Sequence, residues 1–461
     1  MNTRLEQFKK DINGRKISVI GLGISNIPAI KYLNANGAYI IARDKKQEIP
    51  EELKNLDNIE FVVGEDYLSN LRDSDYIFRS PGVKPFTPEI EEAVANGVIL
   101  TSEIETLIHL TDATVIAITG SDGKTTSTTL TSLFLKEAGK KVFVGGNIGT
   151  PLLDKIDEMT SDDYVVLELS SFQLMTLKEK IDRAAITNVS PNHLDYHRSY
   201  EEYIEAKANV FKSQNENDIL VLNADNEFTQ RYEEQAKSKI RKFSLLGETK
   251  CGVYYKEDGN VYSNIDGSEE KIMSIDEIKI VGMHNVANAC TAASLVIDIT
   301  GPEPIRKVLK EFGGVEHRME FVRELNGIKW YNDSIASSPT RTIAGLKAFK
   351  QPVVLIAGGY DKHIPYDVMG EYLMDKVKLL ILVGTTGPKI KEAAEQEAQR
   401  RGVETMPIVE FDNLESAVKY AYENTTNGDI VTMSPASASF DLYKNFEVRG
   451  NLFKELVNNL K

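Results

Sequence analysis

Short β-branched runs alternate with helical patterns along most of the chain, and this alternation restricts the possible folds more than any other feature of the sequence. A helix between two strands returns the chain to the edge where the first strand began, so that the strands can pair in parallel. The pattern therefore predicts an α/β protein built on doubly wound parallel sheets.

The predicted strands fall into three series, which indicate three domains. The first series contains residues 17–20, 39–42, 61–63 and 76–78, the second contains 114–119, 142–144, 164–169, 184–188 and 219–222, and the third contains 328–331, 353–357, 379–383 and 430–434. Short polar-flanked runs between residues 229 and 280 predict antiparallel hairpins that cover one side of the second series. We expect domains over residues 1–110, 111–315 and 316–461, because 461 residues at roughly 150 per domain suggest three.

The overall charge argues against some partners. The chain has 54 Lys and Arg against 69 Asp and Glu, a formal net charge of −15. This balance repels phosphate backbones and anionic lipids, so we expect neither a nucleic acid nor a membrane as a partner. Cys251 and Cys290 are expected to be free thiols, and no apolar leader precedes the first strand, which together predict a cytoplasmic protein.

Residues 119–126 have the pattern of a phosphate-binding loop. The segment reads Thr-Gly-Ser-Asp-Gly-Lys-Thr-Thr, follows an apolar run and precedes a helical pattern. Backbone N–H groups in such a loop can surround phosphate oxygens, so Lys124 is the candidate for the β- and γ-phosphates and Thr125 the candidate for Mg²⁺. The general motif has a glycine where this chain has Ile118, so the loop is shortened, and an ordinary strand-to-helix turn is the alternative.

A second glycine-rich turn follows the first predicted strand. Gly21-Leu22-Gly23-Ile24-Ser25-Asn26, with Asp44 about twenty residues later, imitates a dinucleotide-binding turn but has no glycine at its last position. Nicotinamide or flavin binding, binding of another nucleotide diphosphate and a plain packing turn all stay open on these residues. Ser80-Pro81-Gly82 forms another turn at the same predicted edge of the sheet, where such ligands bind.

Three further side chains could serve a nucleoside triphosphate. Glu168 ends the strand 164–169 and His193 lies just past the strand 184–188, and both ends share an edge with the phosphate loop in a parallel sheet. An acid and an imidazole there can hold divalent cations that neutralise charge during phosphoryl transfer. The alternatives are a structural histidine and, for Lys207 in the helical run 200–212, a solvated helix lysine.

In this order, the motifs resemble the Mur ligase family over essentially the whole chain. The segments that carry the resemblance are residues 21–23, 80–82, 119–126, 145–149, 168–173, 188–195, 282–288, 317–318, 332–334, 434–441 and 444–447, with Lys207. Within the family, they are similar to the members that add D-glutamate. The resemblance implies a three-domain Mur ligase architecture, with a Rossmann-like UDP-sugar domain, a central P-loop ATPase domain with a parallel sheet and a small antiparallel sheet, and a Rossmann-like amino-acid domain.

The resemblance also implies an activity. We expect an ATP-dependent ligase that joins D-glutamate to UDP-N-acetylmuramoyl-L-alanine through an acyl phosphate, in cytoplasmic peptidoglycan precursor synthesis, and that is a monomer. ATP and two Mg²⁺ ions are the expected cofactors. Lys207 is expected to carry a carbamate that binds the second ion beside His193.

The remaining roles are implied residue by residue. The resemblance assigns to the UDP-sugar the residues Gly23, Ser25, Asp44, Ser80, Pro81 and Gly82, and to its muramoyl end Asn147 and His193. It assigns to ATP the residues Gly120, Ser121, Asp122, Gly123, Lys124, Thr125, Thr126, Asn285, Asn288, Arg318 and Asp333, and to metal Thr125, Glu168, His193 and Lys207. The residues implied for D-glutamate are Ser439, Phe440, Phe446 and Lys362. The expected catalytic set is Lys124, Glu168, His193, Lys207 and Arg318.

One position departs from the D-glutamate-adding pattern. Many of those relatives have a lysine after Asn332-Asp333-Ser334, whereas this chain has Ile335, so a cation expected near the amino-acid pocket is missing and Lys362 would take more of its role. Three other functions stay open: a ligase of the folylpolyglutamate type, a nicotinamide dehydrogenase and a non-catalytic nucleotide-binding protein. The predicted strands between residues 17 and 81 count against the first, and only residues 21–44 support the second.

Overall fold

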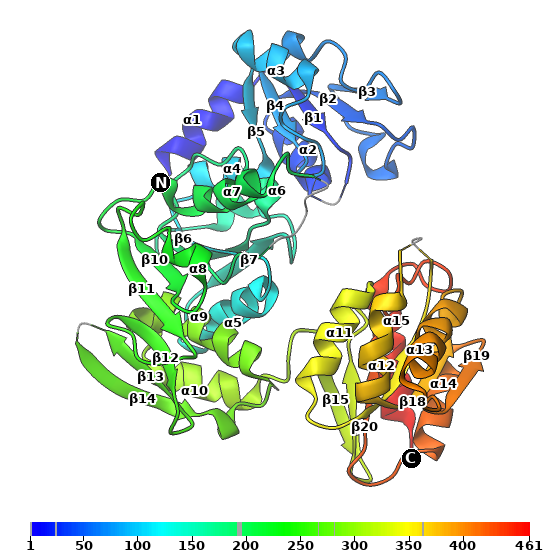
Figure 1. Cartoon of the computed structure of the whole chain (residues 1–461). Coiled ribbons are helices and arrows are strands. Elements are labelled where there is room, and N and C mark those ends of the chain that lie inside the picture. Colours follow the sequence, from blue (N-terminus) through cyan, green and yellow to red (C-terminus); the bar gives the residue numbers. More distant parts are fainter. Residues whose placement is uncertain (1, 24, 191–195, 266, 281, 362–363) are drawn as a thin grey trace. The chain divides into compact units, whose positions relative to one another are not determined.

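The structure, a computed structural model, describes residues 2–23, 25–190, 196–265, 267–280, 282–361 and 364–461. The chain forms two compact units. The first consists of Met1–Ile278 with Met283–Lys310, and the second of Lys279–Gly282 with Glu311–Lys461. The first unit contains two of the sheets in Figure 1 and the second unit contains the third.

The sheet nearest the amino terminus is parallel throughout, with the strand order β3-β2-β1-β4-β5. Its strands are β1 (Lys16–Ile20), β2 (Tyr39–Asp44), β3 (Ile59–Val63), β4 (Tyr76–Arg79) and β5 (Ile99–Thr101). The helices of this region are α1 (Thr3–Ile12), α2 (Asn26–Ala35), α3 (Pro88–Ala95) and α4 (Glu103–Leu110). The carboxyl ends of β1, β2 and β4 therefore lie at one edge, as the sequence pattern predicts.

The central sheet is mixed and has nine strands in the order β14-β13-β12-β11-β10-β9-β6-β8-β7. They are β6 (Thr114–Thr119), β7 (Val142–Gly146), β8 (Tyr164–Glu168), β9 (Arg183–Ile186), β10 (Ile219–Asn223), β11 (Lys239–Ser244), β12 (Gly252–Lys256), β13 (Asn260–Ile265) and β14 (Ser268–Ser274). The helices are α5 (Lys124–Glu137), α6 (Ser171–Leu174), α7 (Tyr200–Lys212), α8 (Glu227–Gln230), α9 (Met283–Thr300) and α10 (Pro302–Glu311). Strands β6 to β12 pair in parallel, and β12, β13 and β14 pair antiparallel.

One hydrophobic core joins the two sheets of the first unit. Buried residues of β1, such as Ile17 and Val19, belong to the same cluster as Ala117 of β6 and Leu167 of β8. Burial of apolar area contributes about 25 cal/mol per Å². A shared core of this kind explains why the amino-terminal and central sheets form one unit.

The sheet of the second unit has the order β15-β16-β20-β17-β18-β19. Its strands are β15 (Glu320–Leu325), β16 (Ile328–Asn332), β17 (Val353–Ala357), β18 (Val377–Val383), β19 (Ile408–Phe411) and β20 (Ile430–Met433), and its helices are α11 (Pro339–Ala348), α12 (Gly370–Lys376), α13 (Gly387–Arg401), α14 (Leu414–Glu423) and α15 (Phe446–Asn459). Leu355 of β17 packs into the core with α11, α12 and α13, whereas its neighbours Val354 and Ile356 pack with α14 and α15. Helices thus cover both faces, which makes the sheet doubly wound.

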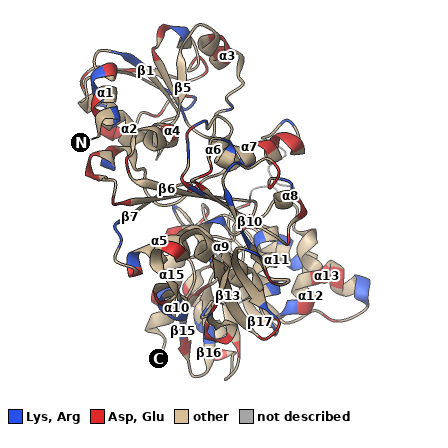
Figure 2. Cartoon of the chain, turned by 90° about the vertical axis from the view of Figure 1, so that its left-hand side faces the viewer, with Lys and Arg blue, Asp and Glu red and all other residues tan. Residues whose placement is uncertain are grey.

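The predicted α/β class is confirmed, and the three predicted series of strands form three sheets. One detail differs, because the antiparallel hairpins continue the central sheet instead of forming a separate small sheet, and β11, in the same stretch, pairs in parallel with both of its neighbours. Acidic and basic segments are interspersed along the chain (Figure 2). No helix in the described part of the chain is both long and apolar enough to span a membrane.

Candidate active site

The phosphate loop lies between β6 and α5, where the sequence predicts it. Gly120 and Gly123 have φ angles of 150° and 80°, which residues with a Cβ rarely adopt. A Cβ at Gly120 would overlap the Thr187 hydroxyl, and one at Gly123 would overlap the side-chain oxygen of Asn288. Both glycines are therefore needed for the tight turn into α5, whose first N–H groups have no partner inside the helix.

Asn188 holds the first half of this loop. Its side-chain oxygen accepts hydrogen bonds from the backbone N–H groups of Ser121 (3.2 Å) and Asp122 (2.9 Å). The Ser121 hydroxyl is fixed as well, at 2.7 Å from the Tyr203 hydroxyl. Since these two amides face Asn188, the N–H groups at the start of α5 are the ones best placed to bind phosphate.

Two lysines converge on the loop. The Lys124 ammonium group donates to the carbonyl oxygens of Gly120 (3.0 Å) and Ser121 (2.9 Å), and that of Lys207 also donates to the Gly120 carbonyl (2.8 Å). Two positive charges that share one acceptor repel each other, so an anion bound at the loop is favoured by both. This charge arrangement agrees with a phosphate site better than with an ordinary strand-to-helix turn.

Lys207 is buried on α7, with only 1 % of its surface exposed. The alternative of a solvated helix lysine is therefore wrong. Burial, followed by the positive charge of Lys124, holds the pKa of Lys207 well below its usual value. The ammonium nitrogen lies 4.5 Å from the centre of the Tyr203 ring. A lysine in this environment loses its proton readily and becomes a nucleophilic amine.

Glu168 ends β8, beside the strand that leads into the loop. It is 1 % exposed, and one carboxylate oxygen accepts a hydrogen bond from the Asn147 side chain at 2.8 Å. The other oxygen is buried and accepts no hydrogen bond from any residue that the structure describes. An unpaired buried carboxylate oxygen is costly and is well suited to a divalent cation.

A metal at Glu168 would need ligands of several kinds. Within the described ranges, no three His, Cys, Asp or Glu side chains cluster closely enough to hold an ion by themselves. Phosphate oxygens, water and a hydroxyl such as that of Thr125 are the usual additional ligands of Mg²⁺. His193, the predicted partner of Glu168, lies outside the described residues.

Helix α9 closes the other side of the loop. Asn288 lies against Gly123, and its side-chain amide donates to the side-chain oxygen of Asn285 at 3.2 Å. The Ser127 hydroxyl donates to the Asn288 backbone carbonyl at 3.4 Å. The two asparagines predicted for the adenine therefore form a pair next to the phosphate loop.

The two turns predicted for the UDP-sugar lie in contact. Ser80 donates its backbone N–H to the Ile20 carbonyl at 2.9 Å, and a Cβ at Gly21 would come within 2.7 Å of the Ser80 Cβ. The Asp44 carboxylate accepts from the Leu22 N–H at 2.7 Å and so holds the turn that contains Gly23. Ser25 is the N-cap residue of α2, and its side chain makes no capping hydrogen bond.

Arg79 connects the turn at residues 80–82 to the central sheet. This side chain is 1 % exposed, and it donates to the Val83 carbonyl at 2.6 Å and to the Phe172 carbonyl of α6 at 3.0 Å. The Tyr196 hydroxyl donates to the Pro81 carbonyl at 2.8 Å. The 80–82 turn is thereby fixed to the segment that follows Glu168.

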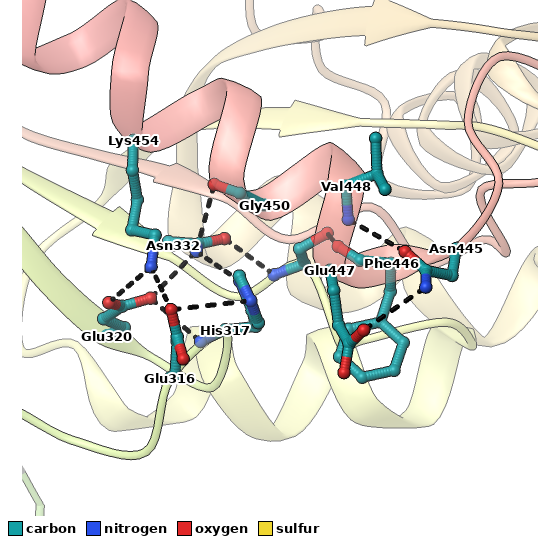
Figure 3. A network of polar contacts seen from close by, with 11 residues as sticks. Glu316, His317, Glu320, Asn332, Asn445, Phe446, Glu447, Val448, Gly450 and Lys454 are labelled. Carbon is teal, nitrogen blue, oxygen red and sulfur yellow. Dashed lines mark hydrogen bonds and ion pairs between the residues drawn. The ribbon is translucent and has the colours of Figure 1, made fainter. Parts of the chain in front are cut away.

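In the second unit, a polar network involves Glu316 and His317 (Figure 3), which directly precede Arg318 in the chain. The Asn332 amide donates to Nδ1 of His317 (3.0 Å) and to the Glu320 carboxylate (2.9 Å), while Lys454 of α15 is ion-paired with Glu316 and Glu320. His317 has a positive φ of 62°, which a non-glycine residue adopts only where its surroundings hold it. The network therefore fixes the Arg318 turn to β16 and α15.

Asp333 lies deep in the second unit, with 3 % of its surface exposed. Its carboxylate accepts hydrogen bonds from the Ser434 hydroxyl (2.6 Å) and the Met319 N–H (3.2 Å). Burial raises the pKa of Asp333 to about 6. The carboxylate thus links the ends of β16 and β20 to the start of β15, next to Arg318.

The three described residues predicted for D-glutamate lie near the carboxyl end of β20 and the start of α15. Ser439 is buried, Phe440 is 62 % exposed, and the Phe446 carbonyl accepts a hydrogen bond from the Ser334 hydroxyl at 2.8 Å. A small pocket lies next to this segment of the chain, and the residues that line it include Gly358, Gly359, Gly384, Asp441 and Arg449. Lys362, the fourth predicted residue, lies outside the described residues.

Sequence reasoning missed several residues that build these sites. Asn188 and Asn332 stand inside segments that the sequence singles out, and Arg79 directly precedes the 80–82 turn, but hydrogen bonds made by a side chain leave no spacing signal in the sequence. Arg449 did have a sequence signal, because its spacing from Phe453 and Val457 places the three residues on one face of α15, and that face is buried.

A glycine-rich loop between a parallel strand and a helix, with a buried acid on the adjacent strand, defines the first unit as a nucleoside-triphosphate-binding α/β protein. Three family models match the chain: Mur ligase MurD-like, N-terminal domain over residues 15–102, Mur ligase middle domain over 118–296, and Mur ligase, glutamate ligase domain over 317–437. The chain belongs to the Mur ligase family, as the motifs predict.

Similar proteins extend over the full length. The UDP-N-acetylmuramoylalanine--D-glutamate ligase of Ruminiclostridium cellulolyticum is 52 % identical over 100 % of both chains, and that of Clostridium acetobutylicum is 50 % identical over the same share. Among solved structures, the UDP-N-acetylmuramate-alanine ligase of Thermotoga maritima has a TM-score of 0.58 at 19 % identity and covers 97 % of this chain and 100 % of its own. MurF from Acinetobacter baumannii has a TM-score of 0.58 at 15 % identity, with 97 % and 92 % covered, so these two structures show the fold alone.

Proposed function

We propose that this chain is an ATP-dependent ligase that joins D-glutamate to UDP-N-acetylmuramoyl-L-alanine, in the synthesis of peptidoglycan precursors. Full-length relatives with half of their residues identical carry the corresponding name. The structural observation that carries the proposal is the phosphate loop beside Glu168, whose second carboxylate oxygen lacks a partner in the described part of the chain. A nicotinamide dehydrogenase would use neither feature.

The proposed reaction activates one carboxylate and then transfers it to an amine. ATP supplies the phosphoryl group that turns the L-alanyl carboxylate into an acyl phosphate, and Mg²⁺ neutralises charge during that transfer. The amine of D-glutamate then attacks the acyl carbon, phosphate leaves, and a peptide bond remains. An acyl phosphate hydrolyses if water reaches it, so the site has to exclude water until the amine is bound.

The first unit is proposed to hold the triphosphate. Lys124 and the N–H groups at the start of α5 bind the β- and γ-phosphates, and Gly120, Ser121, Asp122 and Gly123 shape the loop. Thr126 belongs to the same ATP-binding loop, Thr125 and Glu168 are proposed as metal ligands, and Asn285 and Asn288 are proposed to bind the adenine. Arg318 and Asp333 of the second unit are proposed for the phosphates and the ribose.

Lys207 is proposed to act as a carbamate. The ammonium group first loses one proton, and the neutral amine then attacks CO₂, forms an N–C bond and loses a second proton, so that a cation becomes an anionic oxygen donor. The lowered pKa and the position on the Gly120 carbonyl support this assignment. The carbamate, together with His193, would hold a second Mg²⁺ beside the one at Glu168.

The substrate assignments follow the same residues as the sequence motifs. Gly23, Ser25, Asp44 and the 80–82 turn are proposed for the UDP-sugar, Asn147 and His193 for its muramoyl end, and Ser439, Phe440, Phe446 and Lys362 for D-glutamate. We propose domain boundaries near residues 110 and 315. A monomer in the cytoplasm is the proposed state, since ATP and UDP-linked precursors are cytoplasmic metabolites.

The proposal is tested by ADP release with each substrate omitted in turn. The wild-type protein should release ADP only when both D-glutamate and UDP-N-acetylmuramoyl-L-alanine are present. Lys124→Ala should lower the rate by ~10³ or more, because it removes a cation that stabilises the transferring phosphoryl group. Lys136→Ala, an exposed lysine in the last turn of the same helix, is the control and should be unchanged. ADP release that does not depend on D-glutamate would refute the proposed substrate.

A further inference from the structure

Arg449 is a buried cation next to the segments proposed for D-glutamate. It lies on α15, one turn after Phe446, and only 3 % of its surface is exposed. Its guanidinium group donates to the Ser334 hydroxyl (3.1 Å) and carbonyl (2.9 Å), and to the carbonyls of Ser437 (3.0 Å) and Ala438 (3.0 Å). One side chain therefore joins the segment after β16 to the segment after β20.

These hydrogen bonds orient the 437–439 backbone. All peptide bonds described are trans, and in a trans peptide group the C=O and N–H point in opposite directions. Because the Ala438 carbonyl points at Arg449, the Ser439 N–H points away from the guanidinium. The backbone N–H that is proposed to bind the D-glutamate carboxylate thus takes its direction from Arg449.

The charge of Arg449 is not neutralised locally. Among the described residues, the acceptors of its hydrogen bonds are carbonyl and hydroxyl oxygens, and Asp441 acts on it through charge without a hydrogen bond. Burial lowers the pKa of Arg449 to about 10, although Asp441 opposes this, so the group stays positive at neutral pH. A buried charge without a paired anion is costly, and its field is screened less than at the surface. Binding of an anion nearby relieves that cost.

We propose that Arg449 is the fixed cation of the D-glutamate site and the positioning residue of the 437–439 segment. The inference rests on the proposed function, because it assumes that D-glutamate binds at Ser439 and Phe446. The proposal also bears on Ile335, which stands where many D-glutamate-adding relatives have a lysine. Arg449 donates hydrogen bonds to the neighbouring Ser334 and brings a positive charge to the segment that lacks this lysine.

Steady-state kinetics of two variants test the proposal. Arg449→Met should raise the KM for D-glutamate by about tenfold or more, because it removes charge-assisted hydrogen bonds, while the KM values for ATP and the UDP-sugar change less than about twofold. Arg449→Lys keeps the charge without the planar fork of donors and should recover part of the loss. Carbon-13 NMR of labelled D-glutamate should show the same order of affinities without turnover.

Arg323→Met is the matched control. Arg323 also donates to carbonyls of α15, those of Val457 (3.3 Å) and Asn458 (2.8 Å), but at the far end of the helix. Arg323→Met should leave the KM values for D-glutamate, ATP and the UDP-sugar unchanged.

Three results would overturn the proposal. They are an unchanged D-glutamate KM in folded Arg449→Met, an equal change of all three KM values, and, if Arg449→Met fails to fold, a D-glutamate KM in Arg449→Lys equal to that of the wild type. Failure of the proposed function is a separate outcome, since the wild-type protein would then not need D-glutamate at all.

Discussion

At the scale of single residues, the chemistry of the site depends on which groups are charged when no ligand is bound. Lys124 and Lys207 share the Gly120 carbonyl, and burial together with Lys124 lowers the pKa of Lys207. A lysine acts as a nucleophile only in its neutral form. The phosphate loop therefore lies next to an amine that can react with CO₂ and an ammonium group that can bind phosphate.

Lys207→Arg should abolish the proposed carbamylation and most of the ligase activity. Arginine keeps a positive charge but forms no carbamate, so we expect a loss of ADP release by ~10² or more. Carbon-13 NMR with labelled bicarbonate should show a carbamate signal in the wild-type protein and none in the variant. Lys212→Arg changes an exposed lysine in the last turn of the same helix and should behave as the wild type. A carbamate signal that persists in Lys207→Arg would assign the modification to another lysine.

The members of the candidate site could be predicted from the sequence where they belong to a motif with fixed spacing. The loop glycines, Lys124 and Glu168 follow from the order of strand, turn and helix. The reach of Asn188 into the loop and the partners of Arg449 could not be predicted in the same way, because both depend on how segments distant in sequence meet. Only the fold brings Asn188 next to Ser121 and Arg449 next to Ser437.

At the scale of elements, one carboxylate of α9 forms ion pairs with two strands of the central sheet. Asp298 of α9 accepts hydrogen bonds from Arg183 of β9 (2.7 Å) and Arg241 of β11 (2.8 Å). Burial opposes ionisation, but the two arginines together outweigh it and hold the pKa of Asp298 below its ordinary value. The same helix carries Asn285 and Asn288, so these two ion pairs also support the proposed nucleotide site.

Asp298→Asn should destabilise the first unit at neutral pH by about 1–3 kcal/mol, because it leaves two arginines without their anion. A lowered carboxyl pKa contributes stability above the unfolded value of about 4, and that contribution is lost as the pH falls through the folded pKa. The difference between wild type and variant in urea unfolding should therefore shrink as the pH is lowered below about 4. Asp276→Asn changes an exposed carboxylate and is the control. A pH-independent difference would mean that the pair acts through packing rather than charge.

The elements themselves could be predicted largely from their periodicity. Strands such as 114–119 and 353–357 and the helix at 200–212 lie where the pattern places them. Short or exposed edge strands were missed, namely β5, β15 and β19, because three to six residues at an edge carry little alternation. The parallel pairing of β11 was also missed, since pairing direction depends on a neighbour that the local sequence does not identify.

At the scale of the whole molecule, the amino-terminal and central sheets belong to one unit, although the sequence predicts separate domains. Beside the shared core, Glu103 of α4 is buried and accepts hydrogen bonds from the N–H groups of Leu152 and Leu153, both at 2.9 Å. Lys9 of α1 is ion-paired with Asp157. These contacts connect α1 and α4 to the segment at residues 152–157, so the residues proposed for the two ends of the UDP-sugar belong to a single compact unit.

Glu103→Ala should loosen this connection. Burial raises the pKa of Glu103, while the hydrogen bonds from Leu152 and Leu153 oppose the shift. The alanine removes both hydrogen bonds and leaves the buried N–H groups of Leu152 and Leu153 without an acceptor. Each unpaired group lowers the free energy of unfolding by about 1–3 kcal/mol. Hydrogen exchange at the amides of Leu152 and Leu153 should accelerate by about tenfold or more.

Glu103→Gln keeps an acceptor oxygen and should give a smaller effect, and Glu91→Ala, an exposed acid of α3, should give none. If the Glu103 contact couples the two sheets, heat should unfold the amino-terminal sheet of Glu103→Ala before the central sheet, whereas the wild-type unit should unfold in one transition. Unchanged exchange at Leu152 and Leu153, or a single transition in both proteins, would mean that the shared hydrophobic core alone holds the sheets together.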